Sequence, residues 1–448
     1  MSSRSSVRIR LRRSAWLAQL ALSAPGEIRF PYGSRLAVEE AAGRRFRDAL
    51  AHAARHVPHY RDALRRMGAD PRELRGVDDI RSLPLISREE LHDEPARFLS
   101  DAIPRRNLIA ARTSGASGTP IEVHQDLHST FVAARLGIRY WPVPRHFTGG
   151  VRRPRALAFV NPGAGGSARK EAFRGGALIR AIAPSATRVS MYDTVERNVE
   201  RINSERPEVV SGFGSYLEAI YEHLDETGSS MHSPALVRFG GDGFSARGRR
   251  LIEERFGIPV RGVYASIEAP SIGFECELGG GYHVNADMFP VRIVGPDGSD
   301  CPVGVPGELV VSNLISRGTM LINYKLGDRA SLLDRGCACG RTLPLLSMIE
   351  GRAYDWLERL DGGRLHPEAL KAMFRGEPAV RRFQIRQRER DLIEVAVVPS
   401  SGDLGGLEER LTSRFSERLG GPVHVTIVRV DDLPRTSSGK VKTVVRDC

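Results

Sequence analysis

Hydrophobic residues recur at helical spacing early in the chain, from Leu36 to Met67. Val38, Ala41 and Phe46 stand three to five positions apart with arginine and glutamate among them, which is typical of one buried helix face. Ser87 is followed three residues later by a glutamate, the signature of a helix capping box. These patterns predict a helical N-terminal section.

Beyond about Leu108, short apolar runs alternate with segments of helical spacing, which is typical of a mostly parallel α/β sheet. Strands are expected at 156–160, 209–211, 236–239 and 259–264, and helices at 195–205 and 216–227. From Val291 to Leu333 the apolar runs come closer together, at 291–294, 308–312 and 330–333, with Gly and Pro between them. That segment predicts a smaller, more antiparallel β unit.

The pattern changes again after Gly351. It predicts a strand, then a helix at 367–374, strands at 381–386 and 392–399, a helix at 404–419 and a strand at 423–430, the size and order of a compact α+β domain. We therefore expect an α/β fold with a large N-terminal domain, residues 1–352, built of parallel α/β layers plus the smaller β unit. A small mobile α+β domain, residues 353–448, would follow it.

Charge and cysteine content limit the classes of function. The 448 residues include 66 Lys and Arg against 54 Asp and Glu, but acidic residues are interspersed almost throughout. This favours a diffuse positive field for phosphate-bearing small molecules and argues against a nucleic-acid partner.

Before Glu27 the chain is basic, and a mobile or helical arm is favoured there over a targeting segment. No early apolar stretch is long enough to span a membrane, and five irregularly spaced cysteines indicate a reducing cytoplasm.

Two polar, glycine-containing segments are candidate binding loops. Thr113 to Pro120 holds two glycines and four hydroxyl residues, whose N–H and O–H groups can surround phosphate oxygens, although the ending of a Walker A loop is missing. Pro434 to Lys440 places a glycine beside one of only five lysines, where a slim rotatable charge serves better than a planar arginine. Taken singly, a surface turn and a solvated tail remain open as alternatives.

Together these loops resemble the signature loops of the adenylate-forming superfamily of acyl-CoA ligases and adenylation domains. Three further motifs lie between them in the family's order: Tyr264–Glu268 resembles Tyr-Gly-x-Thr-Glu, Tyr324–Asp328 resembles Tyr-Arg-Thr-Gly-Asp, and Gly351–Asp355 resembles Gly-Arg-x-x-Asp. Within the superfamily the chain is most similar to the phenylacetate-CoA ligase group, through His56–Tyr60, Ser211–Leu217 and Cys337–Arg341. The similarity covers nearly the whole chain after the first few dozen residues.

The resemblance implies a site for ATP and Mg²⁺. Glu268 would hold the Mg²⁺, a hard cation that a carboxylate suits. Asp328 would accept hydrogen bonds from the ribose hydroxyls with Arg352 nearby, and Tyr264 would lie against adenine. The β- and γ-phosphates would be held by the first loop, through Thr113, Ser114, Gly115, Ser117, Gly118 and Thr119.

The resemblance also implies how the reaction proceeds. Lys440 would reach the α-phosphate and the substrate carboxylate, and Asp355 would be the hinge about which the C-terminal domain moves for the thiol half-reaction. An ionised carboxylate attacks the α-phosphorus without a general base, so no Ser/His/Asp triad is required. Turn or core roles for Glu268, Asp328 and Tyr264 are the alternatives, and the order of the whole set argues against them.

By the same resemblance, the acyl pocket would be lined by Tyr140, Trp141, Gly212, Phe213, Gly241, Asp242 and Ala265. Glycines beside aromatic rings suit a flat aromatic or heteroaromatic acid better than a long acyl chain. Asp242 could instead pair with an amino or hydroxyl substituent on the acid.

Four positions depart from the family pattern. Ile267 stands where a hydroxyl residue precedes the motif glutamate, and Ala265 replaces a glycine. Ala116 and Leu326 each stand where a threonine is usual. Each lost neutral hydrogen bond costs about 1 kcal/mol, which slows a reaction about fivefold without abolishing it.

Four residues form a candidate zinc site: Cys276, His283, Cys337 and Cys339. Three thiolates and an imidazole are a common structural zinc set, and four protein ligands leave no open position for catalysis. The Cys-x-Cys spacing is tighter than usual, and reduced cysteines without metal are the alternative.

The sequence therefore predicts a ligase that forms an acyl-adenylate from an aromatic acid and passes the acyl group to CoA. A carrier-protein thiol or an amine is the alternative acceptor. An impaired, zinc-containing binding protein of the same fold is the alternative from another class, suggested by Ile267 and Ala116. The expected partners are small molecules, with a carrier protein and a second copy of the chain as further candidates.

Overall fold

The computed structural model describes residues 19, 22–112, 121–151, 153–160, 186–191, 193, 195–349, 357–361, 364–365, 370, 373–374, 377–400, 404–434, 442 and 444–446. The chain forms two compact units, Met1–Leu326 with Ala330–Met348, and Gly327–Arg329 with Ile349–Cys448. The predicted domain boundary, between Arg352 and Ala353, lies outside the described residues. In the described part of the chain, no helix has both the length and the apolar character needed to cross a membrane.

The predicted helical N-terminal section consists of α2 (Arg35–His56) and α3 (Pro58–Met67). Proline at the first position of α3 fits a helix start, because its missing N–H would have no partner there. Helix α4 (Arg88–Asp93) begins at the predicted capping box, in which Ser87 accepts from Glu90 N. Short 3₁₀ turns connect these elements, at Phe30–Tyr32, Val77–Ser82, Pro95–Phe98 and Arg105–Asn107.

A nine-stranded sheet lies at the centre of the first unit, in the order β13-β14-β9-β8-β7-β6-β5-β3-β4. The predicted parallel strands are β3 (Ala156–Val160), β5 (Val209–Gly212), β6 (Leu236–Phe239) and β7 (Val260–Tyr264), joined by β4 (Ala186–Ser190). An antiparallel part that the sequence did not predict extends the sheet through β8 (Gly273–Glu275), β9 (Tyr282–Val284), β14 (Leu345–Leu346) and β13 (Leu332–Leu333).

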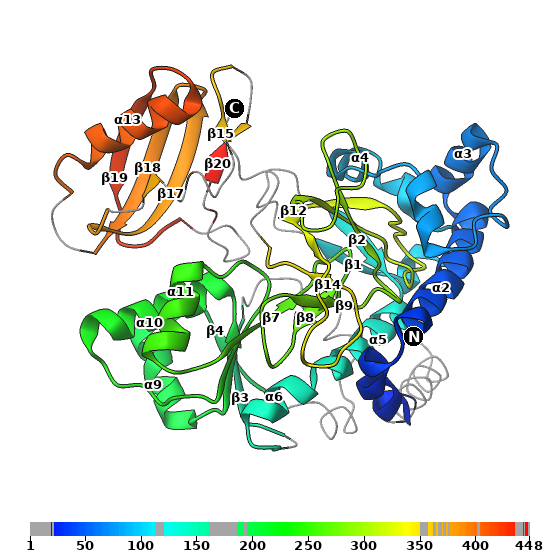
Figure 1. The fold of residues 1–448 in the computed structure, drawn as a ribbon, viewed down its shortest axis with the longest axis horizontal. Helices are drawn as coiled ribbons and strands as arrows, with labels where there is room; N and C mark the ends of the chain where they lie inside the picture. Colours follow the sequence, from blue (N-terminus) through cyan, green and yellow to red (C-terminus); the bar gives the residue numbers. More distant parts are fainter. Residues whose placement is uncertain are drawn as a thin grey trace. The chain divides into compact units, whose positions relative to one another are not determined.

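Helices pack on the parallel strands and form the main core. Figure 1 shows α9 (Val195–Glu205) and α10 (Gly214–Thr227), in green, beside these strands. Leu157 and Val237 of the sheet share one buried apolar cluster with Ile202 and Leu217 of the helices. The remaining helices of this unit are α5 (Leu127–Leu136), α6 (Pro142–Phe147) and α11 (Ala246–Arg250), with a 3₁₀ turn at Gly137–Tyr140 and a π turn at Leu251–Arg255.

Two smaller sheets complete this part of the chain. Strands β1 (Ile109–Arg112) and β2 (Glu122–Gln125) pair antiparallel on either side of residues 113–120. The predicted β unit contains β10 (Val291–Val294), β11 (Gly307–Val311) and β12 (Tyr324–Ala330). The strand predicted at 330–333 overlaps the last residue of β12 and the whole of β13, which belongs to the large sheet, while the rest of β12 was not predicted. In the structure, β12 continues through Gly327, whose φ of +80° is a conformation that glycine adopts readily. In the sequence, a glycine at this position suggests a turn rather than a strand.

The C-terminal unit has a four-stranded sheet in the order β19-β18-β17-β20. Strands β17 (Val380–Glu389) and β18 (Leu392–Pro399) are antiparallel, while β19 (His424–Arg429) and β20 (Val444–Arg446) each add in parallel. Helix α13 (Leu407–Leu419) lies along this sheet (Figure 1). It buries Leu411 and Phe415 in one apolar cluster with Ile385 and Val395 of the strands. A two-stranded sheet joins β15 (Leu357–Glu358) to β16 (Arg364–Leu365). The predicted helix at 367–374 falls mostly outside the described residues.

Candidate functional site

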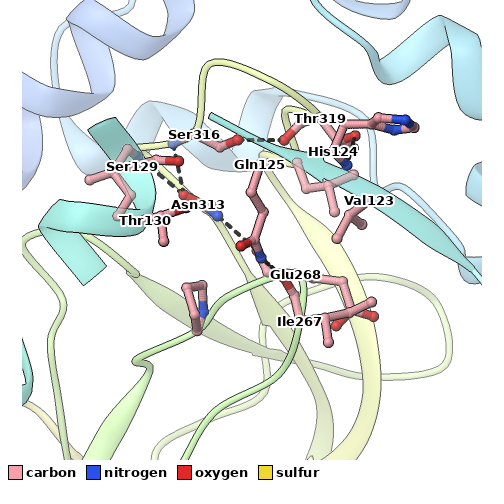
Figure 2. Close-up of a pocket in the computed structure, with 13 residues that line it drawn as sticks. Val123, His124, Gln125, Ser129, Thr130, Ile267, Glu268, Asn313, Ser316 and Thr319 are labelled. Carbon is pink, nitrogen blue, oxygen red and sulfur yellow. Dashed lines mark hydrogen bonds between the residues drawn. The ribbon is translucent and has the colours of Figure 1, made fainter. Parts of the chain in front are cut away.

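The motif glutamate Glu268 lies in a small polar pocket of the first unit (Figure 2). Figure 2 shows β2 and the segment before Glu268 converging on the residues that follow β11. The lining comes from four segments: Val123, His124 and Gln125; Ser129 and Thr130; Ile267, Glu268 and Pro270; and Asn313, Ile315, Ser316, Thr319 and Leu321. Hydroxyl, amide and imidazole groups therefore line the same pocket as the Glu268 side chain.

Two amide side chains fix the backbone around Glu268. Gln125 Nε2 donates to the carbonyl of Ile267 at 2.9 Å, and Asn313 Nδ2 donates to the carbonyl of Glu268 at 2.7 Å. Asn313 Oδ1 in turn accepts from Ile315 N and Ser316 N, at 3.2 and 3.0 Å. The carbonyls that follow β7 are thus satisfied by side chains from distant parts of the sequence, so the glutamate is held in one place.

The carboxylate of Glu268 is 5% exposed and faces one cation and one phenol. Arg88 Nη1 lies 3.7 Å from Glu268 Oε1, and Tyr324 Oη donates to the same oxygen at 3.4 Å. Arg88 is itself buried, which makes the ion pair one between two desolvated groups. A buried carboxylate oxygen is a suitable ligand for a hard cation such as Mg²⁺, so the residues present fit that ion.

Arg88 was not identified from the sequence. It reaches the pocket because Ile86 forms a β-bridge with Tyr324, with Ile86 N to Asn323 O at 3.0 Å and Lys325 N to Ile86 O at 2.9 Å. This bridge places the first turn of α4 beside β12. The capping box predicted the helix start, but nothing in the sequence indicated its partner.

The other nucleotide-site residues are only partly described. Tyr264 ends β7, is 9% exposed, and has its ring centroid 5.6 Å from that of Tyr282. Asp328 lies on β12. The other eight positions predicted for ATP and for the domain hinge, together with Lys440, lie outside the described residues: Thr113, Ser114, Gly115, Ser117, Gly118, Thr119, Arg352, Asp355 and Lys440. Their roles stay predictions.

Part of the predicted acyl pocket comes together at the end of β5. Phe213 precedes α10, and a Cβ on Gly241 would lie 2.9 Å from Phe213 Cε1, so the ring packs directly over Gly241 at φ +89°. Asp242 accepts from Gly214 N at 2.5 Å and from Ser215 Oγ at 2.6 Å. Its carboxylate therefore caps the first turn of α10.

Tyr140 packs in a different apolar cluster, with Val143 and Phe274. Its ring meets Phe274 edge-on at 6.0 Å, and burial raises the pKa of its phenol. Trp141 follows it at the start of α6. Gly212 ends β5, and Ala265 directly follows β7.

The candidate metal ligands Cys276, His283, Cys337 and Cys339 converge although 63 positions separate the first from the last. Their ligand atoms all lie within 4.8 Å of one another, with Cys276 Sγ to Cys337 Sγ at 3.6 Å and Cys339 Sγ to His283 Nε2 at 3.4 Å. A tetrahedral zinc with Zn–S bonds of about 2.3 Å requires sulfur atoms roughly 3.8 Å apart. The donor set and its spacing therefore fit zinc.

Burial shifts the pKa values of two of these ligands. It lowers the pKa of the His283 imidazole to about 4, with Arg341 acting in the same direction, so the ring is neutral and able to bind a metal. It raises the pKa of the Cys276 thiol to about 12. Arg341, 3% exposed, donates to the Glu277 carboxylate at 2.8 and 3.0 Å and lies over the Tyr32 ring at 4.9 Å.

The chain resembles known proteins along most of its length. Residues 357–447 match the family model described as the CapK C-terminal domain. The chain is 27% identical to a phenylacetate-coenzyme A ligase of Thermus thermophilus, over 90% of this chain and 94% of that protein, and 26% identical to the one of Escherichia coli, over 88% and 92%.

Its fold is also found among solved structures. The crystal structure of 2-hydroxyisobutyryl-CoA ligase in the postadenylation state, in complex with R3-HIB-AMP, superposes with a TM-score of 0.73 at 19% identity, covering 94% of this chain and 91% of that one. The expectation of an α/β fold with a C-terminal α+β unit is confirmed. The chain thus has the fold of the adenylate-forming ligases and is similar over about nine-tenths of its length to phenylacetate-CoA ligases.

Proposed function

We propose that this chain is an AMP-forming carboxylic acid–CoA ligase. The observation that carries the proposal is the buried Glu268 in a polar pocket, at the position of the family's metal-binding glutamate, with Gln125 and Asn313 bonded to the backbone carbonyls of Ile267 and Glu268. Curated relatives that match nine-tenths of the chain are CoA ligases, which supports the same reaction class.

The reaction has two steps. A carboxylate oxygen of the acid attacks the α-phosphorus of ATP, a new P–O bond forms, and the bond to pyrophosphate breaks. The CoA thiol, losing its proton, then attacks the acyl carbon, and the bond between that carbon and AMP breaks. Mg²⁺ supplies neutralisation of the triphosphate charge when it is bound, with Glu268 as its protein ligand.

The chain's own residues would bind and orient the nucleotide. Tyr264 would lie against adenine and Asp328 would accept from the ribose hydroxyls, with Arg352 beside them. Lys440 would place its ammonium between the α-phosphate and the acid, where negative charge grows in the transition state. The loop Thr113–Thr119 would cradle the outer phosphates with its N–H and O–H groups.

The proposed acid is aromatic or heteroaromatic. The Phe213 ring lies against Gly241, where a side chain would meet it, and an aromatic ring at this place in the proposed pocket suits a planar acid. Zinc at Cys276, His283, Cys337 and Cys339 is proposed to be structural, because four protein ligands leave no position for a substrate.

The test is exchange of pyrophosphate into ATP, measured with a panel of aromatic and aliphatic acids. We expect exchange that depends on an aromatic acid, and formation of its CoA thioester when CoA is added.

Glu268→Gln should lower exchange by about tenfold to a hundredfold, since one charged contact worth about 1.5–3 kcal/mol is lost. Glu253→Gln, a carboxylate on the π turn that pairs with Arg261, is the control and should keep full exchange. Absence of exchange with every acid, in folded protein that binds ATP, would favour the impaired binding protein.

A further inference from the structure

The segment that contains Lys440 begins and ends beside one buried side chain, Gln384 of β17. Gln384 is 4% exposed, and its Nε2 donates to the carbonyl of Pro434 at 3.3 Å and to that of Lys442 at 2.9 Å. These residues stand just before and just after positions 435–441. One amide group therefore ties both ends of that segment, using both of its N–H donors.

The strand alternation explains why a glutamine lies there. Ile385 faces the apolar cluster beneath α13, so Gln384 points to the opposite face of the sheet. Its register partner on β18 is Ala396, which belongs to a small cluster with Val398 and Leu433. A small side chain opposite Gln384 leaves room for its amide to meet the incoming backbone.

Strand β17 also anchors the chain on both sides of the tie. Before residues 435–441, Arg382 of β17 forms an ion pair with Asp432, and Leu433 is 5% exposed. After them, β20 pairs in parallel with β17, with Ile385 opposite Val444. The two ends of the segment are thus fixed to the same strand, and Gln384 contacts both of them.

We infer that Gln384 is a positioning residue for adenylation, acting through Lys440. The inference rests on the proposed function. A lysine that must reach a phosphate and a carboxylate at once depends on a defined starting point for its flexible side chain, and tying both ends of a short segment restricts where that point can be. Gln384 binds the backbone carbonyls of Pro434 and Lys442 and so acts on the chain at these two positions.

The experiment compares two isosteric changes on one strand. Gln384→Met removes both donors and keeps the side-chain length. Gln387→Met is the matched control, because Gln387 is also a fully buried glutamine of β17, bonded instead to Glu358 and to the Arg390 carbonyl. Adenylation is measured by pyrophosphate exchange with the best acid, and thiolation by CoA thioester formation from the preformed acyl-adenylate.

We expect Gln384→Met to lower the kcat of adenylation by about tenfold to a hundredfold, the range for a misplaced catalytic group, while thiolation changes by less than about twofold. Gln387→Met should keep both half-reactions even if it melts earlier. Equal loss of both half-reactions in Gln384→Met, or unchanged adenylation, would overturn the inference. Should Gln384→Met fail to fold, Gln384→Asn keeps an amide on the sheet but is one methylene too short to reach both carbonyls.

A second readout is independent of activity. Arg435 and Lys440 are trypsin sites within the tied segment. In native-state proteolysis followed by mass spectrometry, cleavage there should be several-fold faster in Gln384→Met than in the wild type or in Gln387→Met. A second outcome is that the wild type shows no pyrophosphate exchange with any acid while cleavage is still faster in Gln384→Met. That result refutes the proposed function but supports the restraint of the segment by Gln384. Unchanged cleavage refutes the tie itself.

Discussion

Removing one ligand from the Cys276, His283, Cys337 and Cys339 cluster should release a metal ion. It should also destabilise the segment around Pro31 and Gly33, which is bonded to residues close to the cluster. Cys337→Ser is the cleanest change, since serine keeps the size of the side chain but supplies no thiolate. The consequence extends beyond the cluster, because the segment that carries Cys337 and Cys339 continues directly into Arg341 and Thr342. Thr342 N donates to Pro31 O at 2.7 Å, and Thr342 Oγ1 donates to Gly33 O at 2.7 Å.

The size of the effect follows from linkage. A metal present at a thousandfold excess over its dissociation constant stabilises the folded state by about 4 kcal/mol. A cooperative unit of about 350 residues, the size of the first unit, loses about 0.7 kcal/mol of stability per degree near its melting temperature. Loss of the metal should therefore lower the melting temperature of that unit by about 6 °C.

Three measurements on purified protein check this prediction. Elemental analysis should find about one zinc per chain in the wild type and far less in Cys337→Ser. Thermal melting should show the shift, and a strong chelator should reproduce it in the wild type. Hydrogen exchange should increase in the peptide that covers Pro31 and Gly33. Cys301→Ser is the control, because Cys301 is a free cysteine outside the cluster and should leave metal and melting unchanged. Metal-free wild-type protein whose melting ignores the chelator would refute the site.

Two further variants test a proposed role and a buried ion network. Lys440→Ala should cripple pyrophosphate exchange while thiolation from preformed acyl-adenylate persists, and Lys442→Ala should keep both; equal loss of the two half-reactions in Lys440→Ala would contradict the role given to Lys440. Arg139→Met should destabilise the first unit by about 3–5 kcal/mol in urea unfolding, because it removes the buried guanidinium that pairs with both Asp287 and Glu27. A loss below about 1 kcal/mol would show that Arg45 and Arg135, which also contact those carboxylates, suffice.

Elements with a clear hydrophobic period were predictable from the sequence. The predicted helix at 195–205 and the strands at 156–160 and 291–294 agree with α9, β3 and β10 residue for residue. The antiparallel part of the large sheet was not predicted, because β8 and β9 are three residues long and buried along their whole length. Strands of that kind show no alternation of polar and apolar residues, so only their pairing reveals them.

In the site, too, the residues with a distinctive local chemistry could be predicted, whereas those that depend on distant contacts could not. The metal ligands could be grouped because cysteine is scarce in this chain and thiolates and imidazole share one coordination chemistry. Arg88 and Gln384 could not be identified, since an arginine among 61 and a glutamine within a strand carry no distinctive pattern. Their importance arises from register: Ile86 against Tyr324 in one case, and Gln384 beside Pro434 and Lys442 in the other.

Asp242 shows how local geometry can redirect a group that a motif suggests for the substrate. One of its carboxylate oxygens accepts from Gly214 N and the other from Ser215 Oγ, in the first turn of α10. A carboxylate at the start of a helix is stabilised there by the unpaired backbone N–H groups, so a substituent on the acid would have to compete with bonds already made. We therefore expect selection among acids in the proposed pocket to rest on shape, through the ring of Phe213 against Gly241, where any side chain at position 241 would meet that ring.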